Sequence, residues 1–237
     1  DYDMIQPGDR VAVGVSGGKD SLVLLTALAR LREFYPKPFT VEAITLDMGT
    51  GMNFAPVAEY CGRIDVPYTC IQTEIAHVVF DVRKEKNPCS MCAKMRRGAL
   101  HSALKERGLN KIALGHHLSD VLETTLLGLF YGAQLQTMPP KLRSRNFPGM
   151  ELIRPLYCVH EYAIIAWKNY NGLRFLQCAC RFTERCATCG GEKGSKRDEM
   201  KELIAELRKR CDTIDMNIFN SVHNINLKTV IGYHKGD

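Results

Sequence analysis

The strongest constraint on this chain is an apolar strand that runs directly into a turn of small residues and then a helix. Residues 11–21 read Val-Ala-Val-Gly-Val-Ser-Gly-Gly-Lys-Asp-Ser, and residues 22–31 have the composition of a helix. Small residues let the backbone approach a ligand closely, and the N–H groups of the turn and the helix start favour phosphate. The alternative is an ordinary glycine-rich turn. The predicted ligand-binding residues are Ser16, Gly17, Gly18, Lys19, Asp20 and Ser21.

The spacing of this turn differs from that of the common P-loop. A P-loop has four residues between its first glycine and the Gly-Lys-Ser/Thr that follows. Here three residues separate Gly14 from Gly18, and Asp20 follows the lysine. The sequence therefore indicates a phosphate-binding turn of another class.

Strand-like and helical segments alternate along the rest of the chain. This alternation predicts an α/β fold, a doubly wound parallel sheet with helices on both faces and a ligand site at the carboxyl ends of the strands. Residues 142–153 read as a hairpin or a loop, and 196–210 as a charged helix. The other predicted strands are 41–46, 68–72 and 111–114, and the other predicted helices are 54–63, 95–107 and 121–131, with one more helix after residue 156.

Polar residues follow two of the predicted strands and should reach the same edge of the sheet as the turn. Asp47 ends one strand, where it either contacts a nucleotide or caps a turn. Gly115, His116 and His117 follow another strand, and Asp120 begins the next helix as a candidate metal ligand or general base. A helix start is again favourable for an anion.

The chain has 237 residues, of which 45% are hydrophobic, so it can bury a substantial core. It has no long apolar run and no recognisable signal peptide, so we expect a soluble, cytoplasmic protein that does not enter a membrane. The chain opens almost directly on its first strand, so we expect a trimmed N-terminus. The formal net charge of +6 comes with grouped Lys and Arg residues. Such groups suit a polyanion, or are solvated helix faces.

Ten cysteines in a cytosolic chain indicate metal or catalytic sulfur rather than a disulfide framework. Cys89 and Cys92 form one CxxC pair, which could be half of a zinc site, half of an iron–sulfur site or a redox pair. Arg96 and Arg97 follow it and would stabilise thiolates and bind phosphate. A second group comprises Cys178, Cys180, Cys186 and Cys189.

The motifs and their order resemble those of the PP-loop ATP pyrophosphatase superfamily, and within it the tRNA 2-thiocytidine synthetases. The resemblance covers roughly residues 11–156. It implies the adenine nucleotide α-hydrolase-like fold and cleavage of ATP between its α and β phosphates. The motifs are Ser-Gly-Gly-Lys-Asp-Ser, Cys-Ser-Met-Cys with Arg-Arg-Gly, Ile-Ala-Leu-Gly-His-His, Phe-Tyr-Gly, Met-Pro-Pro-Lys and Ile-Arg-Pro-Leu.

This resemblance also implies ATP with Mg²⁺ and a [4Fe–4S] cluster held by three cysteines. Cys89 and Cys92 carry over as the first two ligands, and Cys178 aligns best as the third, with Cys180 as the alternative. The catalytic residues it implies are Lys19, Asp20, Asp120, Cys89 and Cys92, and the nucleotide-binding ones include Asp47, Gly115 and His116.

The chain departs from the family pattern at two places. The usual Asp-Asp after the histidine pair is Ser119-Asp120, so only Asp120 carries over. The single CxxC expected near the third ligand is replaced by Cys178-x-Cys180 and a further CxxC. The remaining cysteines, among them Cys186 and Cys189, could hold a separate Zn²⁺ or cap the open iron of the cluster.

The resemblance further implies a tRNA substrate whose base carbonyl, on the family analogy that of a cytidine, is adenylated and then replaced by sulfur. Arg96, Arg97 and Lys141 are the expected tRNA contacts. The sulfur would come from a cysteine desulfurase or free sulfide, and a homodimer is left open. We expect residues 1–156 to form the ATP-binding domain, and 157–237 a helical, cysteine-rich extension that supplies the third cluster ligand and tRNA contacts.

Two other functions fit part of the sequence. A zinc-stabilised PP-loop ligase or amidotransferase-like enzyme would explain the turn but not the pairing of Cys89 and Cys92 with a distant cysteine. A nucleic-acid-binding iron–sulfur sensor would not need an intact Lys19, Asp20 and Ser21.

Overall fold

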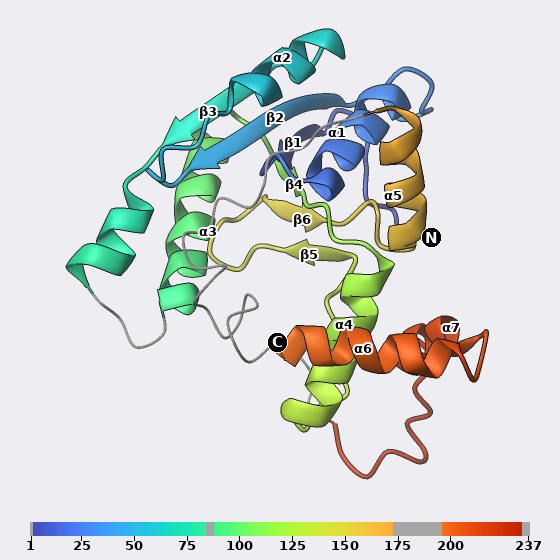
Figure 1. Cartoon of the computed structure of the whole chain (residues 1–237). Helices are drawn as coiled ribbons and strands as arrows, with labels where there is room; N and C mark the ends of the chain where they lie inside the picture. The colour runs from blue at the N-terminus through green and yellow to red at the C-terminus, as the bar shows by residue number, and fades with distance from the viewer. Residues whose placement is uncertain (1, 84–87, 173–195, 234–237) are drawn as a thin grey trace. The chain divides into compact units, whose positions relative to one another are not determined.

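The computed structural model describes residues 2–83, 88–172 and 196–233, apart from the side chain of Cys89. Within these ranges the strands form one sheet in the order β3-β2-β1-β4-β6-β5 (Figure 1). The strands are β1 Arg10–Gly14, β2 Thr40–Asp47, β3 Tyr68–Gln72, β4 Lys111–Ala113, β5 Lys141–Arg143 and β6 Glu151–Ile153. The α-helices are α1 Lys19–Leu31, α2 Ala55–Arg63, α3 Pro88–Glu106, α4 Leu118–Tyr131, α5 Glu161–Tyr170, α6 Lys196–Arg208 and α7 Ile214–Ser221, and η1 His77–Val82 is a π-helix.

The order of the strands reverses at β1. The chain proceeds outward from β1 to β2 and β3, then returns to place β4 on the other side of β1. The pairs β1–β2, β2–β3, β1–β4 and β4–β6 are parallel. In open parallel sheets ligands bind at such a switch point, outside the carboxyl ends of the strands. The expected ligand site therefore lies where β1 and β4 end.

Helices cover both faces of the sheet, so β1 is buried on both sides. Val11 and Val13 pack in a cluster with α1, α2 and α5, whereas Ala12 packs in a second cluster with Leu104 of α3. Successive side chains of a strand point to opposite faces, so one apolar strand serves both clusters. The predicted doubly wound α/β fold is confirmed.

The predicted elements are present, but α4 begins at Leu118 rather than at residue 121, and η1 and α7 were not predicted. Two further differences concern the CxxC pair and the edge of the sheet. Helix α3 begins at Pro88 rather than Met95, so the CxxC pair lies within the helix. Proline suits a first helical position, because its φ is already helical and the missing N–H has no partner there. The predicted hairpin adds an edge strand, β5, antiparallel to β6, so the sheet is mixed.

A buried lysine joins two strands, β4 and β6, to the segment before β1, at the edge of the sheet opposite to the predicted site. Lys111 is 2% exposed, and its Nζ lies 2.8 Å from Asp9 Oδ2 and 2.9 Å from Glu151 Oε2. It also donates to the Met4 carbonyl at 2.7 Å. Burial would raise the pKa of both carboxyls, but hydrogen bonds, including those from Lys111, hold each pKa below its ordinary value.

Lys111→Met should lower the free energy of unfolding by about 3 to 5 kcal/mol, because it leaves the buried Asp9 carboxylate without its cation. Chemical denaturation measures this, and Lys37→Met, which removes a partly exposed partner of the exposed Asp3, should have a far smaller effect. In the wild type, the lowered carboxyl pKa values stabilise the fold fully above about pH 4, the unfolded value. That contribution should disappear as the pH falls through the folded values. Equal free energies of unfolding in K111M and the wild type would show that the ion pairs of Lys111 do not stabilise the fold.

The chain divides into two compact units. One comprises residues 1–118 and 139–183, and holds the sheet, and the other comprises residues 119–138 and 184–237. The functional boundary expected near residue 156 stays a prediction. No helix of the described ranges combines the length and apolar character needed to span a membrane.

Candidate functional site

The turn after β1 is closed by its own serines. Ser21 Oγ donates to the Gly18 carbonyl at 2.9 Å and lies 3.3 Å from the Ser16 backbone N–H, which donates to it. Gly17 has φ +82°, a conformation that side chains with a Cβ rarely adopt. Gly18 is the N-cap of α1 in an extended conformation. The turn therefore has a defined shape before any ligand binds.

Helix α1 begins immediately after this turn, at Lys19. The first N–H groups of an α-helix have no acceptor within the helix and carry its partial positive charge. Because β1 ends at the switch point of the sheet, these groups lie at the edge where an α/β fold binds ligands. The arrangement suits a phosphate group.

Lys19 is held between two carboxylates. Its Nζ lies 2.8 Å from Asp20 Oδ1 and 2.9 Å from Glu161 Oε1, at the start of α5. Burial alone would lower the pKa of Lys19, but the hydrogen bonds to Asp20 and Glu161 raise it above its ordinary value. His117 Nε2 approaches the same Asp20 oxygen at 3.7 Å. Lys19 is therefore a charged and oriented group beside the turn.

The loop after β4 packs directly on the start of α1 because Gly115 has no side chain. A Cβ at Gly115 would lie 2.9 Å from the backbone carbon of Asp20 and 3.1 Å from the backbone nitrogen of Ser21. Such contacts are with backbone atoms, which cannot rotate away. The structure thus joins the turn after β1 to Gly115 and His117, as expected for two neighbouring parallel strands.

Gly115→Ala should push this loop away from α1 and lower the free energy of unfolding by about 1 to 3 kcal/mol. The affinity of the variant for the ligand that binds at the turn should fall as well, because the loop after β4 and the start of α1 form one site. The matched control is Gly62→Ala in α2, where a Cβ meets nothing within 4 Å and helix propensity favours alanine. Thermal unfolding of both variants tests this, and equal effects would refute the close approach.

Asp47 ends β2 at the same edge of the sheet and is 8% exposed. Its Oδ1 accepts the Gly49 backbone N–H at 2.9 Å, which is the turn role that the sequence left open. The nearby Thr45 Oγ1 donates to the Val15 carbonyl at 2.8 Å and links β2 to the turn. A nucleotide contact by Asp47 stays a prediction.

The CxxC helix reaches this edge as well. Cys92 is partly exposed, and its Sγ lies 3.8 Å from Sδ of Met48, the residue after Asp47. Cys89 belongs to the same helix three positions earlier. In the described ranges no three His, Cys, Asp or Glu side chains gather to hold a metal. Outside those ranges lie the predicted third ligand, Cys178, its alternative Cys180, and the zinc candidates Cys186 and Cys189.

Asp120 lies in the first turn of α4, in the second compact unit. Arg197 of α6 pairs with its Oδ1 at 3.6 Å and with Glu123 Oε2 at 2.7 Å. Burial raises the pKa of Glu123 above its ordinary value, although Arg197 opposes the shift. The roles of Asp120 in metal binding or proton transfer stay predictions.

The predicted tRNA contacts differ in their availability. Arg96 and Arg97 are exposed on α3, the helix that carries the CxxC pair. Lys141 is partly buried, and its Nζ lies 3.3 Å from Glu151 Oε2 and donates to the Asp3 carbonyl at 3.0 Å. The ammonium of Lys141 thus already has a carboxylate partner. Arg96 and Arg97 are therefore the better candidates for contact with tRNA phosphates.

Sequence reasoning missed Glu161, and it singled out His116 rather than His117 as the histidine near the turn. The partners Glu161 and Lys19 lie 142 positions apart, so no local pattern links them. The available signal was an acidic residue at the start of a helix, which commonly only stabilises that helix.

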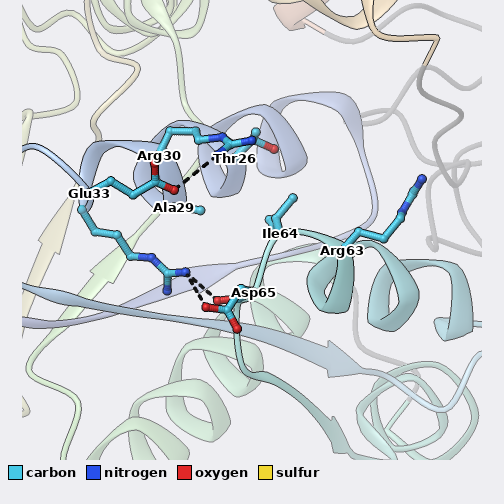
Figure 2. A pocket seen from close by; sticks show the side chains of 8 residues that line it. Thr26, Ala29, Arg30, Glu33, Arg63, Ile64 and Asp65 are labelled. Carbon is cyan, nitrogen blue, oxygen red and sulfur yellow. Dashed lines mark hydrogen bonds and ion pairs between the residues drawn. The ribbon is translucent and has the colours of Figure 1, made fainter.

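A pocket of about 180 Å³ lies between α1 and α2, at the far end of α1 from Lys19 (Figure 2). Two of its three arginines pair with acids of the pocket itself, Arg30 with Glu33 at 3.3 Å and Arg32 with Asp65 at 3.4 Å. The third, Arg63, lies over the ring of Tyr60, 5.3 Å from its centroid. Carboxyl-terminal helix ends carry partial negative charge. This pocket therefore does not favour a phosphate group, and the candidate site remains the turn after β1.

Comparison with known proteins places these features in context. A family model described as a PP-loop domain matches residues 3–180. The tRNA-cytidine(32) 2-sulfurtransferase of Paraburkholderia phymatum is 40% identical over 95% of this chain, which spans 65% of that protein's length. The enzyme of the same name from Anaeromyxobacter sp. strain K is 37% identical over 95% of this chain, which spans 75% of its length.

One solved structure with the same fold is the U34-tRNA thiolase NcsA from Methanococcus maripaludis with its [4Fe–4S] cluster. The TM-score is 0.72 at 22% sequence identity, and the alignment covers 95% of this chain and 76% of that one.

Proposed function

Because the chain belongs to the PP-loop family, and within it to the family of tRNA-cytidine(32) 2-sulfurtransferases, we propose that it is an ATP-dependent tRNA sulfurtransferase. The observation that carries the proposal is the meeting of two parts at one edge of the sheet. The turn that holds Lys19 follows β1, and Cys92 of α3 lies against Met48, which follows β2. A nucleotide cradle and a cysteine helix at one edge suit a reaction that needs both.

The first step would activate a base carbonyl, that of cytidine C2 by analogy with the relatives. The carbonyl oxygen attacks the α-phosphorus of ATP, the bond to the β-phosphate breaks, and pyrophosphate leaves. Lys19 and the N–H groups at the start of α1 would stabilise the charge on the departing pyrophosphate. The base then carries an AMP ester, which is a far better leaving group than the original oxygen.

The second step would exchange AMP for sulfur. A sulfur nucleophile attacks the ring carbon, the carbon–oxygen bond breaks, and AMP departs with the former carbonyl oxygen. The residues that would hold a [4Fe–4S] cluster are Cys89, Cys92 and Cys178. When bound, a cluster with three protein ligands supplies an iron position for incoming sulfur.

Among the three proposed ligands, the side chain that the structure describes is that of Cys92. It is a partly buried thiol, and its Sγ lies 3.8 Å from another soft sulfur atom, Met48 Sδ. Thiolates are the usual protein ligands of iron–sulfur clusters. The solved thiolase of the same fold carries a [4Fe–4S] cluster, which supports the same choice here.

Substrate tRNA would bind through phosphates, with the target base unstacked from its loop. The exposed Arg96 and Arg97 follow the CxxC pair on α3, so they place positive charge next to the cysteine helix. Mg²⁺ would accompany ATP through phosphate oxygens and one or two carboxylates, of which Asp120 is the candidate. A cysteine desulfurase or free sulfide as the sulfur source, and a homodimer, belong to the same proposal.

Nucleoside mass spectrometry of tRNA tests this function. Transfer RNA from a strain without the gene should lack a thionucleoside, and the purified protein with ATP, Mg²⁺ and sulfide should restore it under anaerobic conditions. A brown protein with iron and absorbance near roughly 400 nm supports the cluster. A colourless protein with stoichiometric zinc and no thionucleoside product would instead support the ligase alternative.

A further inference from the structure

We propose that Glu161 positions Lys19 for its task at the departing pyrophosphate, an inference that rests on the proposed ATP-dependent function. Glu161 touches Lys19 and not the reacting atoms, so it acts through the lysine. The contact is short, 2.9 Å between Glu161 Oε1 and Lys19 Nζ. Both side chains are mostly buried, that of Glu161 being 33% exposed and that of Lys19 28% exposed. It joins two elements that lie far apart in the sequence, the start of α5 and the start of α1.

The fold holds Glu161 in place from two sides. Ile164 and Trp167 anchor α5 in the core cluster shared with α1, and Figure 1 shows the two helices side by side. Just before α5, the Val159 carbonyl accepts the Leu118 backbone N–H at 2.9 Å. The segment that leads into Glu161 is therefore bonded to the end of the loop that starts at Gly115. The Glu161 carboxylate is therefore held in one position, and it can fix the position of the flexible Lys19 side chain.

Lys19 needs such a point because its ammonium ends a flexible four-carbon chain. Asp20 comes from the next position on the same helix, and by itself holds the ammonium from one side only. Glu161 adds a second carboxylate from another element. Two anchors from different directions define where the charge sits, which matters when catalysis depends on orientation.

The geometry also leaves the lysine able to act. An ammonium has three N–H donors, and the contacts with Asp20 and Glu161 account for two of them. The third donor can reach a phosphate oxygen while both contacts persist. The start of α5 favours a carboxylate at position 161, because the amino end of a helix is partially positive. The same contacts raise the pKa of Lys19, which keeps it charged.

Chemical labelling tests the contact without using activity. The full protein with its metal would be treated briefly with an amine-acylating succinimidyl ester in the absence of ATP, and modification of Lys19 measured by peptide mass spectrometry. Glu161→Ala should increase the labelling rate of Lys19 by about threefold or more, because the ammonium loses an anchor and becomes more reactive. Glu33→Ala, which removes an exposed acid just after the end of α1, is the control and should match the wild type. Unchanged labelling in E161A would overturn the proposal.

Kinetics test the role itself. For tRNA-dependent pyrophosphate release, Glu161→Ala should lower kcat by about tenfold to a hundredfold, with less than about a threefold change in KM for ATP. Glu161→Gln should recover most of kcat, because its amide oxygen still accepts from Lys19. A lower KM for ATP with kcat kept would overturn the proposal and show that Glu161 competes with ATP for Lys19. A wild type that releases no pyrophosphate would refute the proposed function, while the labelling result still decides the contact.

Discussion

Lys19→Ala should reduce tRNA-dependent pyrophosphate release by about a hundredfold to a thousandfold, the usual effect of removing a group that stabilises charge in a transition state. The reason is local, since Lys19 is a charged side chain at the start of α1 and is oriented by Asp20 and Glu161. The fold should survive, because Lys19 lies at the rim of the core rather than inside it. Thermal unfolding and iron content should therefore stay close to those of the wild type.

The control for this variant is Lys105→Ala, which removes an exposed lysine near the end of α3. Its pyrophosphate release should equal that of the wild type. Release by K19A within about threefold of the wild type would remove Lys19 from the reaction. A fall in release that is matched by a loss of thermal stability would show a structural role instead.

Cys92→Ser should remove most of the iron and abolish thiolation while ATP binding is kept. A serine hydroxyl is a poor substitute for a thiolate at an iron–sulfur cluster. The turn proposed to bind ATP lies on other elements, between β1 and α1, so its geometry should not depend on the cluster. Iron analysis, thionucleoside mass spectrometry and ATP-binding calorimetry measure the three quantities separately.

Cys158→Ser is the matched control for this variant, because Cys158 is an exposed thiol outside the CxxC helix. Its iron content and thiolation should be normal. If C92S keeps its full iron, Cys92 is not a cluster ligand and the proposed sulfur step loses its basis. If C92S also loses ATP binding, the two parts of the site are coupled more closely than the elements that carry them indicate.

The alternation of strand-like and helical segments was enough to predict the α/β class. The segment 68–72 forms β3 where its residues indicated a strand, because apolar and β-branched residues in a short run act locally. The start of α3 was missed, since Cys-Ser-Met-Cys-Ala has no apolar repeat to show a helix. Its helical state depends on the rest of the helix, which continues through Leu104 into the core beneath the sheet.

The part of the site that lies within one segment was predictable in the same way. Residues 14–21 contain both the turn and the start of the helix, so their conformation follows from neighbouring residues, and the prediction of a phosphate site rests on the same residues. Asp47 was assigned to the correct edge of the sheet because it ends a strand. Its contact with Gly49, which favours the turn role, required coordinates.

The amino-acid sequence by itself determined the turn after β1, proposed here as a phosphate site, and the alternation of strands and helices, because both depend on residues close together in the chain. Only the tertiary structure decided which acid accompanies Asp20 at Lys19, and how closely Gly115 approaches α1. Those contacts connect positions about a hundred or more residues apart. Their geometry depends on how α5 and the loop after β4 pack against the sheet, and no short sequence pattern encodes that packing.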